Sequence, residues 1–236
     1  MSRARLAIIN DLHMGVGDHP KRKMERAAEL CERAVDELNA TIKPDITWIL
    51  GDLVQEPDEA ETEARYTELL SHFKRLESLW RILPGNHDWP PSRFFDFFPL
   101  PLPREDIAGL RLMPFIDEEA PGYCAERSAY DLERMRAARD DGWEGPAIGL
   151  QHMSFHPPGS TDCPFNMSNH EACMEAMTEG GFSLSVGAHH HDGLDVQSDK
   201  QRYIVCRALC EAPHPFSVID CDLETQLFSL SEVPLG

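Results

Sequence analysis

Basic residues are scarce in this chain. Its 236 residues include 22 Lys and Arg against 41 Asp and Glu, which gives a formal net charge of −19. A surface this acidic repels the phosphates of nucleic acids and of anionic membranes. We therefore expect neither a nucleic acid nor a membrane as a partner. A phosphate-bearing substrate would need a local source of positive charge, and bound metal ions are such a source.

Long hydrophobic runs are also absent. No segment approaches the ~20 apolar residues that a membrane-spanning helix needs, and Leu6–Ile9 is too short for the apolar region of a signal peptide. The 7 cysteines are an odd number without a Cys-x-x-Cys pair, which favours reduced thiols. We expect a soluble cytoplasmic protein. Its length suits one domain over residues 1–236, and its oligomeric state stays open.

Hydrophobic periodicity predicts alternating strands and helices. Short apolar runs predict strands at 6–10, 46–50, 82–83, 147–150 and 182–186, and helical spacing predicts helices at 21–41, 59–79, 128–139 and 170–179. The tail predicts consecutive strands at 202–207, 216–220 and 226–230, and the proline-rich stretch 90–103 predicts an irregular loop. Alternation indicates parallel pairing and the tail indicates antiparallel pairing. We expect an α/β (α+β) fold with mixed sheets flanked by helices.

Polar side chains of a metal-binding kind follow five of the predicted strands. These are Asp11 and His13, then Asp52, then Asn86, His87 and Asp88, then His152, and finally His189, His190 and His191. Ligands of open α/β sheets bind beyond the carboxyl ends of the strands, so these clusters should meet at one rim. Imidazole, carboxylate and amide oxygen suit divalent Mn, Fe, Zn or Co.

Each cluster has an ordinary explanation when it is taken alone. A single Asp-x-His is usually a solvated loop, Gly51-Asp52 is a common turn, and an isolated histidine after a strand is more often structural than a ligand. The interpretation as a metal site depends on the joint pattern, because five separate segments place ligand-type residues at equivalent strand ends. No phosphate loop of the Gly-x-x-x-x-Gly-Lys-Ser/Thr type competes with it.

The order Asp-x-His, Gly-Asp, Gly-Asn-His-Asp, His and His-x-His resembles the calcineurin-like metallophosphoesterase superfamily. The resemblance runs from Asp11 to Gly193, and Gly85-Asn86-His87-Asp88 is its most specific part. It implies a two-sheet β-sandwich core with helices on both outer faces. It also implies two divalent metal ions per chain.

The resemblance assigns a role to each motif residue. One metal would be held by Asp11, His13, Asp52 and His191, and the other by Asp52, Asn86, His152 and His189, with Asp52 bridging. His87 would be the catalytic histidine and no ligand, Asp88 would orient it, and Asn86, His87 and His156 would contact the substrate.

Three positions depart from the family pattern or leave a choice open. Ala188 stands where the family usually has the glycine of Gly-His-x-His, so His190 competes with its neighbours as a ligand, and His156 competes with His152. We prefer His152 because it directly follows a predicted strand. Gln55 replaces the metal-binding tyrosine of purple acid phosphatases, which argues against that subgroup.

The expected function is hydrolysis of a phosphate ester by a hydroxide that bridges the two metals. The motif loops are nearly free of cations, and the nearest candidates in sequence are Lys21, Arg22, Arg93 and Lys200. This favours a singly charged small phosphodiester, such as a cyclic nucleotide, in a pocket that includes the loop 153–169. A nuclease on the same scaffold and a non-catalytic metal-binding interaction module are the alternatives.

Overall fold

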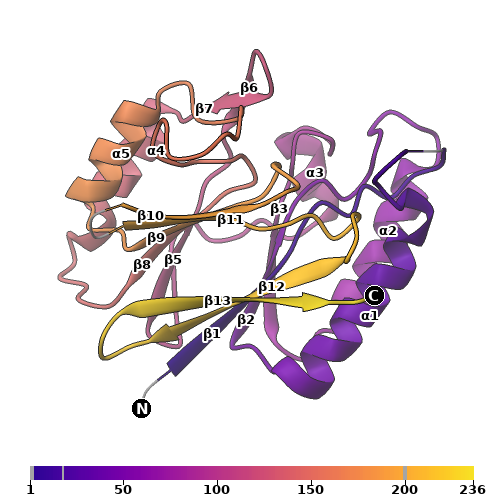
Figure 1. Cartoon of the computed structure of the whole chain (residues 1–236), viewed down its shortest axis with the longest axis horizontal. Coiled ribbons are helices and arrows are strands. Elements are labelled where there is room, and N and C mark those ends of the chain that lie inside the picture. Colours follow the sequence, from indigo (N-terminus) through magenta and orange to yellow (C-terminus); the bar gives the residue numbers. More distant parts are fainter. Residues whose placement is uncertain (1–2, 18, 199–200) are drawn as a thin grey trace.

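Two mixed β-sheets face each other in the computed structural model, which describes residues 3–17, 19–198 and 201–236 (Figure 1). The first sheet has the strand order β13-β12-β1-β2-β3. Its strands, in chain order, are β1 Arg3–Ile9, β2 Ile46–Leu50, β3 Leu79–Leu83, β12 Pro215–Asp222 and β13 Leu227–Pro234. The pairs β1–β2 and β2–β3 are parallel, whereas β12 runs antiparallel to both of its neighbours.

The second sheet has the order β10-β11-β9-β8-β5-β4. Its strands are β4 Glu105–Ile107, β5 Leu110–Pro114, β8 Ala147–Leu150, β9 Leu184–Gly187, β10 Leu194–Ser198 and β11 Gln201–Val205. Strands β5, β8, β9 and β11 are parallel, and the two edge strands are antiparallel to their neighbours. A separate hairpin pairs β6 Glu118–Ala120 with β7 Cys124–Glu126.

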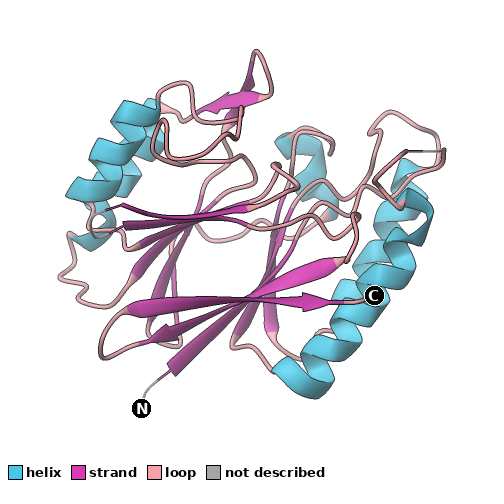
Figure 2. Cartoon of the chain, viewed as in Figure 1, coloured by secondary structure: helices cyan, strands magenta, loops and turns pink. Residues whose placement is uncertain are grey.

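Helices cover the outer face of each sheet (Figure 2). On the first sheet lie α1 Ala27–Glu37, α2 Thr62–Phe73 and α3 Pro91–Phe97; on the second lie α4 Ala129–Arg136 and α5 His170–Glu179. Short 3₁₀ turns at Met24–Arg26 and Ala137–Arg139 and a π turn at Leu38–Ile42 extend α1 and α4. The expected two-sheet fold with helices on both outer faces is confirmed.

Three apolar layers follow from the alternation of side chains along the strands. In β1, Ala7 and Ile9 pack toward α1 and α2, whereas Leu6 and Ile8 pack between the two sheets. The third layer lies between the second sheet and α4–α5. Because both faces of the central strands are covered, each strand is apolar on both sides, which explains the continuous hydrophobic runs in the sequence.

The tail differs from its prediction. Strand β11 pairs parallel with β9 in the second sheet, whereas β12 and β13 form the antiparallel edge of the first. The chain therefore changes sheets between β11 and β12. The proline-rich stretch also contains the short helix α3, which has Pro91 in its first turn, where a missing N–H leaves no hydrogen bond unmade.

Within residues 3–17, 19–198 and 201–236, the helices are all too short or too polar to cross a membrane.

Candidate metal centre and active site

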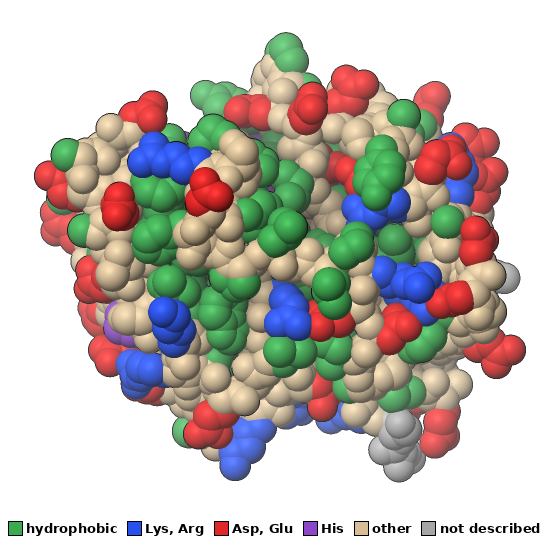
Figure 3. Space-filling view, turned by 180° about the vertical axis from the view of Figure 1, so that it is seen from behind, with side chains coloured by type: hydrophobic (Ala, Val, Ile, Leu, Met, Phe, Trp, Pro, Cys, Tyr) green, Lys and Arg blue, Asp and Glu red, His purple; other side chains and the backbone are tan. Residues whose placement is uncertain are grey.

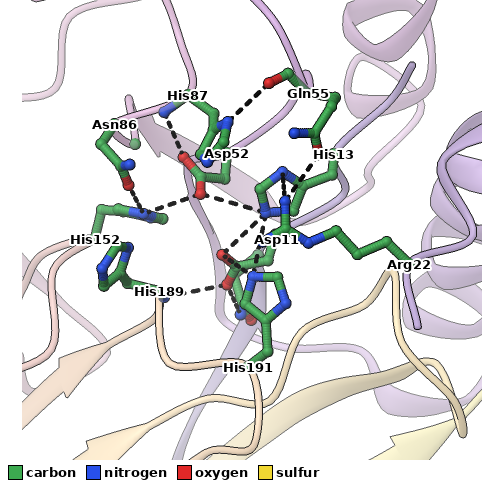
Figure 4. Close-up of polar contacts among 12 residues, drawn as sticks. Asp11, His13, Arg22, Asp52, Gln55, Asn86, His87, His152, His189 and His191 are labelled. Carbon is green, nitrogen blue, oxygen red and sulfur yellow. Dashed lines mark hydrogen bonds and ion pairs between the residues drawn. The ribbon is translucent and has the colours of Figure 1, made fainter. Parts of the chain in front are cut away.

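The carboxyl ends of five parallel strands bring the predicted motif residues to one place. Asp11 follows β1, Asp52 follows β2, and Asn86 and His87 follow β3; from the second sheet, His152 follows β8, and His189 follows β9. Figure 4 shows these side chains pointing toward one another together with His13 and His191.

Two glycines allow the loops after β2 and β3 to touch. A Cβ atom on Gly51 would lie 2.2 Å from the Gly85 nitrogen, and one on Gly85 would lie 2.2 Å from Asp52 Oδ1. Only a residue without a side chain fits at each position. This close approach lets Asp52 Oδ1 accept a hydrogen bond from the His87 backbone N–H at 2.9 Å.

Four of the motif residues have left-handed backbone conformations. The φ angles are 50° at Asp11, 47° at His13, 52° at Asp52 and 71° at His189. Such angles are uncommon for residues other than glycine, and they concentrate at functional sites. All four residues lie in the loops that follow the buried strands β1, β2 and β9.

The first ligand group surrounds Asp11. His191 Nε2 lies 3.3 Å from Asp11 Oδ1, and His13 Nε2 lies 3.2 Å from His191 Nε2. Asp11 Oδ1 is fully buried, yet it has no hydrogen-bond partner. Two ring nitrogens and an unsatisfied carboxylate oxygen that face a common point fit a divalent cation.

The second ligand group shares Asp52 with the first. Asp52 Oδ2 lies 3.4 Å from His13 Nε2 and 3.4 Å from His152 Nε2. His152 Nε2 is also 3.2 Å from Asn86 Oδ1, and His189 brings a nitrogen into the same group. One carboxylate oxygen thus lies between two sets of ligand atoms, the arrangement that a bridging ligand needs. The residues present fit two metal ions.

Hydrogen bonds fix which ring nitrogen of most site histidines faces the centre. His152 Nδ1 lies 2.6 Å from the Leu50 carbonyl, His191 Nδ1 lies 2.8 Å from Glu211 Oε1, and His189 Nε2 lies 3.0 Å from the Tyr123 carbonyl. In each case the N–H donates to the acceptor, so the other ring nitrogen is the one that would bind a metal. Such outer partners commonly orient histidine ligands.

The buried charges of the site stabilise one another. Burial alone would raise the pKa of Asp11, but His191 and His13 hold it well below its usual value. Burial alone would likewise lower the pKa of His191, but Asp11 raises it to about 11. For His189, burial and the nearby His152 lower the pKa to about 4. His189 is therefore neutral at pH 7, the form that binds a metal.

Asp88 does not contact His87 in the way the sequence predicted. Asp88 Oδ1 accepts hydrogen bonds from the Leu53 N–H and the Tyr66 hydroxyl, each at 3.0 Å, and Oδ2 accepts one from the Gly85 N–H at 2.8 Å. His87 Nδ1 lies 2.7 Å from the Gln55 carbonyl instead. Asp88 therefore joins the loops after β2 and β3, and Gln55 orients His87. Burial and the charge of Asp52 raise the pKa of Asp88 to about 7.

His156 does not reach the centre, contrary to the prediction that it contacts the substrate. Its Nε2 lies 3.0 Å from the Phe165 carbonyl, and its Nδ1 lies 3.2 Å from the Pro157 carbonyl. Both ring nitrogens thus face carbonyl oxygens of its own loop, and in the neutral ring one of them donates. The structure instead places His152 among the ligand atoms, and His190 lies outside the ligand groups formed by the described residues.

Glu211 and Cys210 were missed as site residues, and Gln55 was noted only as a departure from one subgroup. Glu211 lies 20 residues from His191, and Gln55 lies 32 residues from His87. Cys210 joins His13 and His191 in a third group of ligand-type atoms. A fourth group includes His87 with His13 and Asp52. Their sequence context carries no signal, because only the tertiary fold brings them to the site.

Two cavities open beside the centre. One, of about 460 Å³, is lined by Arg22, Asp52, His87 and His189, and also by Phe165 from the loop 153–169. The other, of about 550 Å³, is lined by Trp89, Phe115, Glu118 and His152. Asn86 borders both cavities. Phe155 packs in the core instead, against Tyr203 at 5.3 Å between ring centres.

Of the four cations nearest to the motifs in sequence, Arg22 lines the first cavity. Lys21 is an exposed residue 3.8 Å from Asp192, and Arg93 lies over the Trp89 ring at 3.6 Å. Lys200 lies outside the described residues. The motif loops are nearly free of cations, but the fold brings Arg22 to the site from outside them.

Solved structures share this fold at low sequence identity. A dimetal phosphatase from Danio rerio superposes with a TM-score of 0.76 at 14% identity, over 98% of this chain and 96% of that one. A purple acid phosphatase from yellow lupin (Lupinus luteus) gives 0.63 at 12% identity, over 99% of this chain and 52% of that one. GAP50, the anchor in the inner membrane complex of Plasmodium, gives 0.66 at 8% identity, over 99% and 85%.

No curated protein sequence matches the chain significantly. The family model of the calcineurin-like phosphoesterases, however, matches residues 4–193. This range contains all five motifs, from Asp11 to His191, at the strand ends where the structure brings them together. The chain therefore belongs to the calcineurin-like phosphoesterase family, whose members are metal-dependent phosphoester hydrolases.

Proposed function

We propose that this protein hydrolyses a small-molecule phosphate ester at two divalent metal ions. Asp11, His13 and His191 hold one ion, Asn86, His152 and His189 hold the other, and Asp52 is shared by both. The observation that carries the proposal is the position of Asp52 Oδ2, which lies 3.4 Å from both His13 Nε2 and His152 Nε2.

When bound, the two ions would supply positive charge for the phosphate and lower the pKa of a water molecule between them. His87 would serve as the general acid for the leaving oxygen. Its Nδ1 donates to the Gln55 carbonyl, so its Nε2 is the nitrogen left for substrate, and its side chain lines the smaller cavity. A positioned acid of this kind contributes roughly 10²–10⁴-fold to the rate.

The size and charge of the surroundings favour a small substrate over nucleic acid. The cavities of about 460 and 550 Å³ suit a drug-sized molecule. On the face shown in Figure 3, Lys and Arg side chains are interspersed with Asp and Glu and form no continuous stripe. With a net charge of −19, an extended nucleic acid would be repelled. The complete ligand set and His87 argue against a non-catalytic module.

A preference for phosphodiesters loses its main support. It depended on a site without side-chain cations, whereas Arg22 lines the cavity that contains His87. Two cavities that meet at Asn86 would still accommodate the two substituents of a diester. We propose a small phosphate ester as the substrate.

The seven cysteines are free thiols, which supports our proposal of a reducing, cytoplasmic compartment.

The test is hydrolysis of p-nitrophenyl phosphate and bis-p-nitrophenyl phosphate after separate loading with Mn, Fe, Zn or Co. We expect activity that needs metal, stops with a chelator and returns when metal is restored. A protein that binds metal but hydrolyses neither ester under any loading would contradict the proposal. Cleavage of single-stranded or duplex DNA at physiological salt, faster than cleavage of small esters, would favour the nuclease alternative.

A further inference from the structure

Arg22 is fixed in place beside the catalytic residues. Its Nη1 donates a hydrogen bond to Gln55 Oε1 at 2.8 Å, and its backbone N–H donates to His19 Nδ1 at 3.0 Å. Its backbone also pairs with that of Glu211. In Figure 4 the guanidinium reaches the side of the centre where His13 and Gln55 lie. The side chain is therefore held at the wall of the cavity that contains His87 and Asp52.

Among the described residues, Arg22 has no carboxylate counter-ion. Its side-chain neighbours are a neutral amide and an imidazole, its Nε is buried without a partner, and no carboxylate pairs with it within the part of the chain that the structure describes. Most arginines of this acidic chain do pair with carboxylates, as Arg111 does with Asp106 and Asp141. A half-buried cation without an anion is unfavourable unless a ligand supplies one.

His13, the neighbour of Arg22, also lacks an acceptor for its outer ring nitrogen once a metal is bound. Arg22 Nη1 lies 3.4 Å from His13 Nδ1, whereas His13 Nε2 faces Asp52 and His191. If Nε2 binds a metal, Nδ1 must carry the ring proton, so two donors then face each other. The other site histidines place this second nitrogen against a carbonyl or a carboxylate, for example His191 against Glu211. An acceptor is therefore missing beside Arg22 and His13.

We propose that Arg22 binds the phosphate of the substrate and makes phosphomonoesters the preferred class. This inference rests on the proposed function. Near neutral pH a monoester phosphate is largely a dianion with three terminal oxygens, whereas a diester has one charge and two such oxygens. A planar guanidinium can bond two oxygens at once, so it gains most from the dianion.

The experiment compares Arg22→Met and Arg22→Lys with the wild-type protein at equal metal loading. We expect the wild type to have the higher kcat/KM with p-nitrophenyl phosphate than with bis-p-nitrophenyl phosphate. Arg22→Met should lower the monoester value by about 10–100-fold, the range of one hydrogen bond to a charged group, and the diester value by less than about 3-fold. Arg22→Lys keeps the charge but cannot bond two oxygens in the planar geometry of a guanidinium. Its monoester kcat/KM should therefore lie between those of the wild type and Arg22→Met.

Binding of inorganic phosphate gives a readout that needs no turnover. Calorimetry on the metal-loaded proteins should show a phosphate Kd that is about 10–100-fold weaker for Arg22→Met, with an unchanged metal content. Arg93→Met is the matched control, because Arg93 also lacks a carboxylate partner among the described residues but lies over Trp89. Arg93→Met should leave the phosphate Kd and the kcat/KM values for both esters unchanged. Should Arg22→Met fail to fold, the phosphate Kd and the monoester-to-diester ratio of Arg22→Lys decide the inference.

The outcomes separate the two proposals. A wild type that hydrolyses neither ester overturns the proposed function, and the phosphate Kd then still tests Arg22 alone. An active wild type that prefers the diester overturns the inference. So do Arg22 variants whose phosphate affinity and monoester-to-diester ratio equal those of the wild type.

Discussion

Replacement of Asp88 should lower the free energy of unfolding, because this carboxylate accepts three hydrogen bonds and does not contact His87. The carboxylate accepts hydrogen bonds from the Leu53 N–H, the Gly85 N–H and the Tyr66 hydroxyl, and its side chain is buried. Asp88→Ala leaves three donors without an acceptor. An unsatisfied buried donor costs about 1–3 kcal/mol, and water that enters the vacated space recovers part of this. We expect the free energy of unfolding to fall by about 3–5 kcal/mol.

Asp88→Asn tests the same hydrogen bonds without leaving a cavity. The amide oxygen can keep the hydrogen bonds at Oδ1, but the amide nitrogen then faces the Gly85 N–H, donor against donor. We expect a loss of about 1–2 kcal/mol, because one donor is left unsatisfied. The assay is urea unfolding with a chelator present, so that metal affinity does not contribute. It is run at pH 8, where Asp88, with a pKa of about 7, is mostly ionised.

A double-mutant cycle identifies the partner. Tyr66→Phe removes the hydroxyl that donates to Asp88 and accepts from the Trp89 N–H. If Asp88 joins the loops as described, Tyr66→Phe and Asp88→Asn should be coupled by about 0.5–3 kcal/mol. The reasoning is refuted if Asp88→Asn leaves the free energy of unfolding within about 0.5 kcal/mol of the wild type while kcat falls by 100-fold or more. That result would mean that Asp88 acts on His87 itself.

Three further predictions concern the ligands. His87→Ala should keep both metals, measured by elemental analysis, while diester hydrolysis falls by roughly 10²–10⁴-fold; loss of a metal would instead make His87 a ligand. Asp52→Asn should weaken both metal sites, because Oδ2 lies 3.4 Å from a histidine nitrogen of each group; a variant that still binds two ions per chain with wild-type affinity would contradict the bridging role. His152→Ala should lose one metal per chain, whereas His156→Ala should keep both, and the reverse pattern would show that the two histidines were assigned the wrong way round.

Local sequence predicted the parts of this protein that depend on local patterns. The buried strands β1, β2, β8 and β9 are short apolar runs, so the residues after them could be assigned to one rim before the fold was known. Strand β10 was missed, although Leu194 and Val196 alternate with polar residues in the manner of a half-buried strand. The alternating pattern was present but covers only the 5 residues of the strand.

Residues that act through tertiary contacts could not be predicted in this way. Gln55 was noted only as a departure from one subgroup, yet its carbonyl orients His87 and its side chain holds Arg22. Glu211 follows β11 and reaches His191 across 20 residues of sequence. The sequence separation of such pairs is arbitrary, because it depends on how the loops return to the rim. The family resemblance assigned Asp88 to orient His87, whereas the fold directs the two side chains to different partners.

The left-handed turns at Asp11, His13, Asp52 and His189 have a consequence for the evolution of this chain. A left-handed backbone at a residue with a side chain costs roughly 1–2 kcal/mol relative to glycine, which adopts it freely. At these four positions, selection for metal-binding side chains therefore opposes selection for stability. In a lineage that no longer needs the activity, glycine should replace His189 before it replaces the fully buried His13, because His189 is only half-buried and its loss leaves a smaller cavity. A homologue with glycine in place of His189 would keep the fold without the backbone strain and would have lost the second metal site.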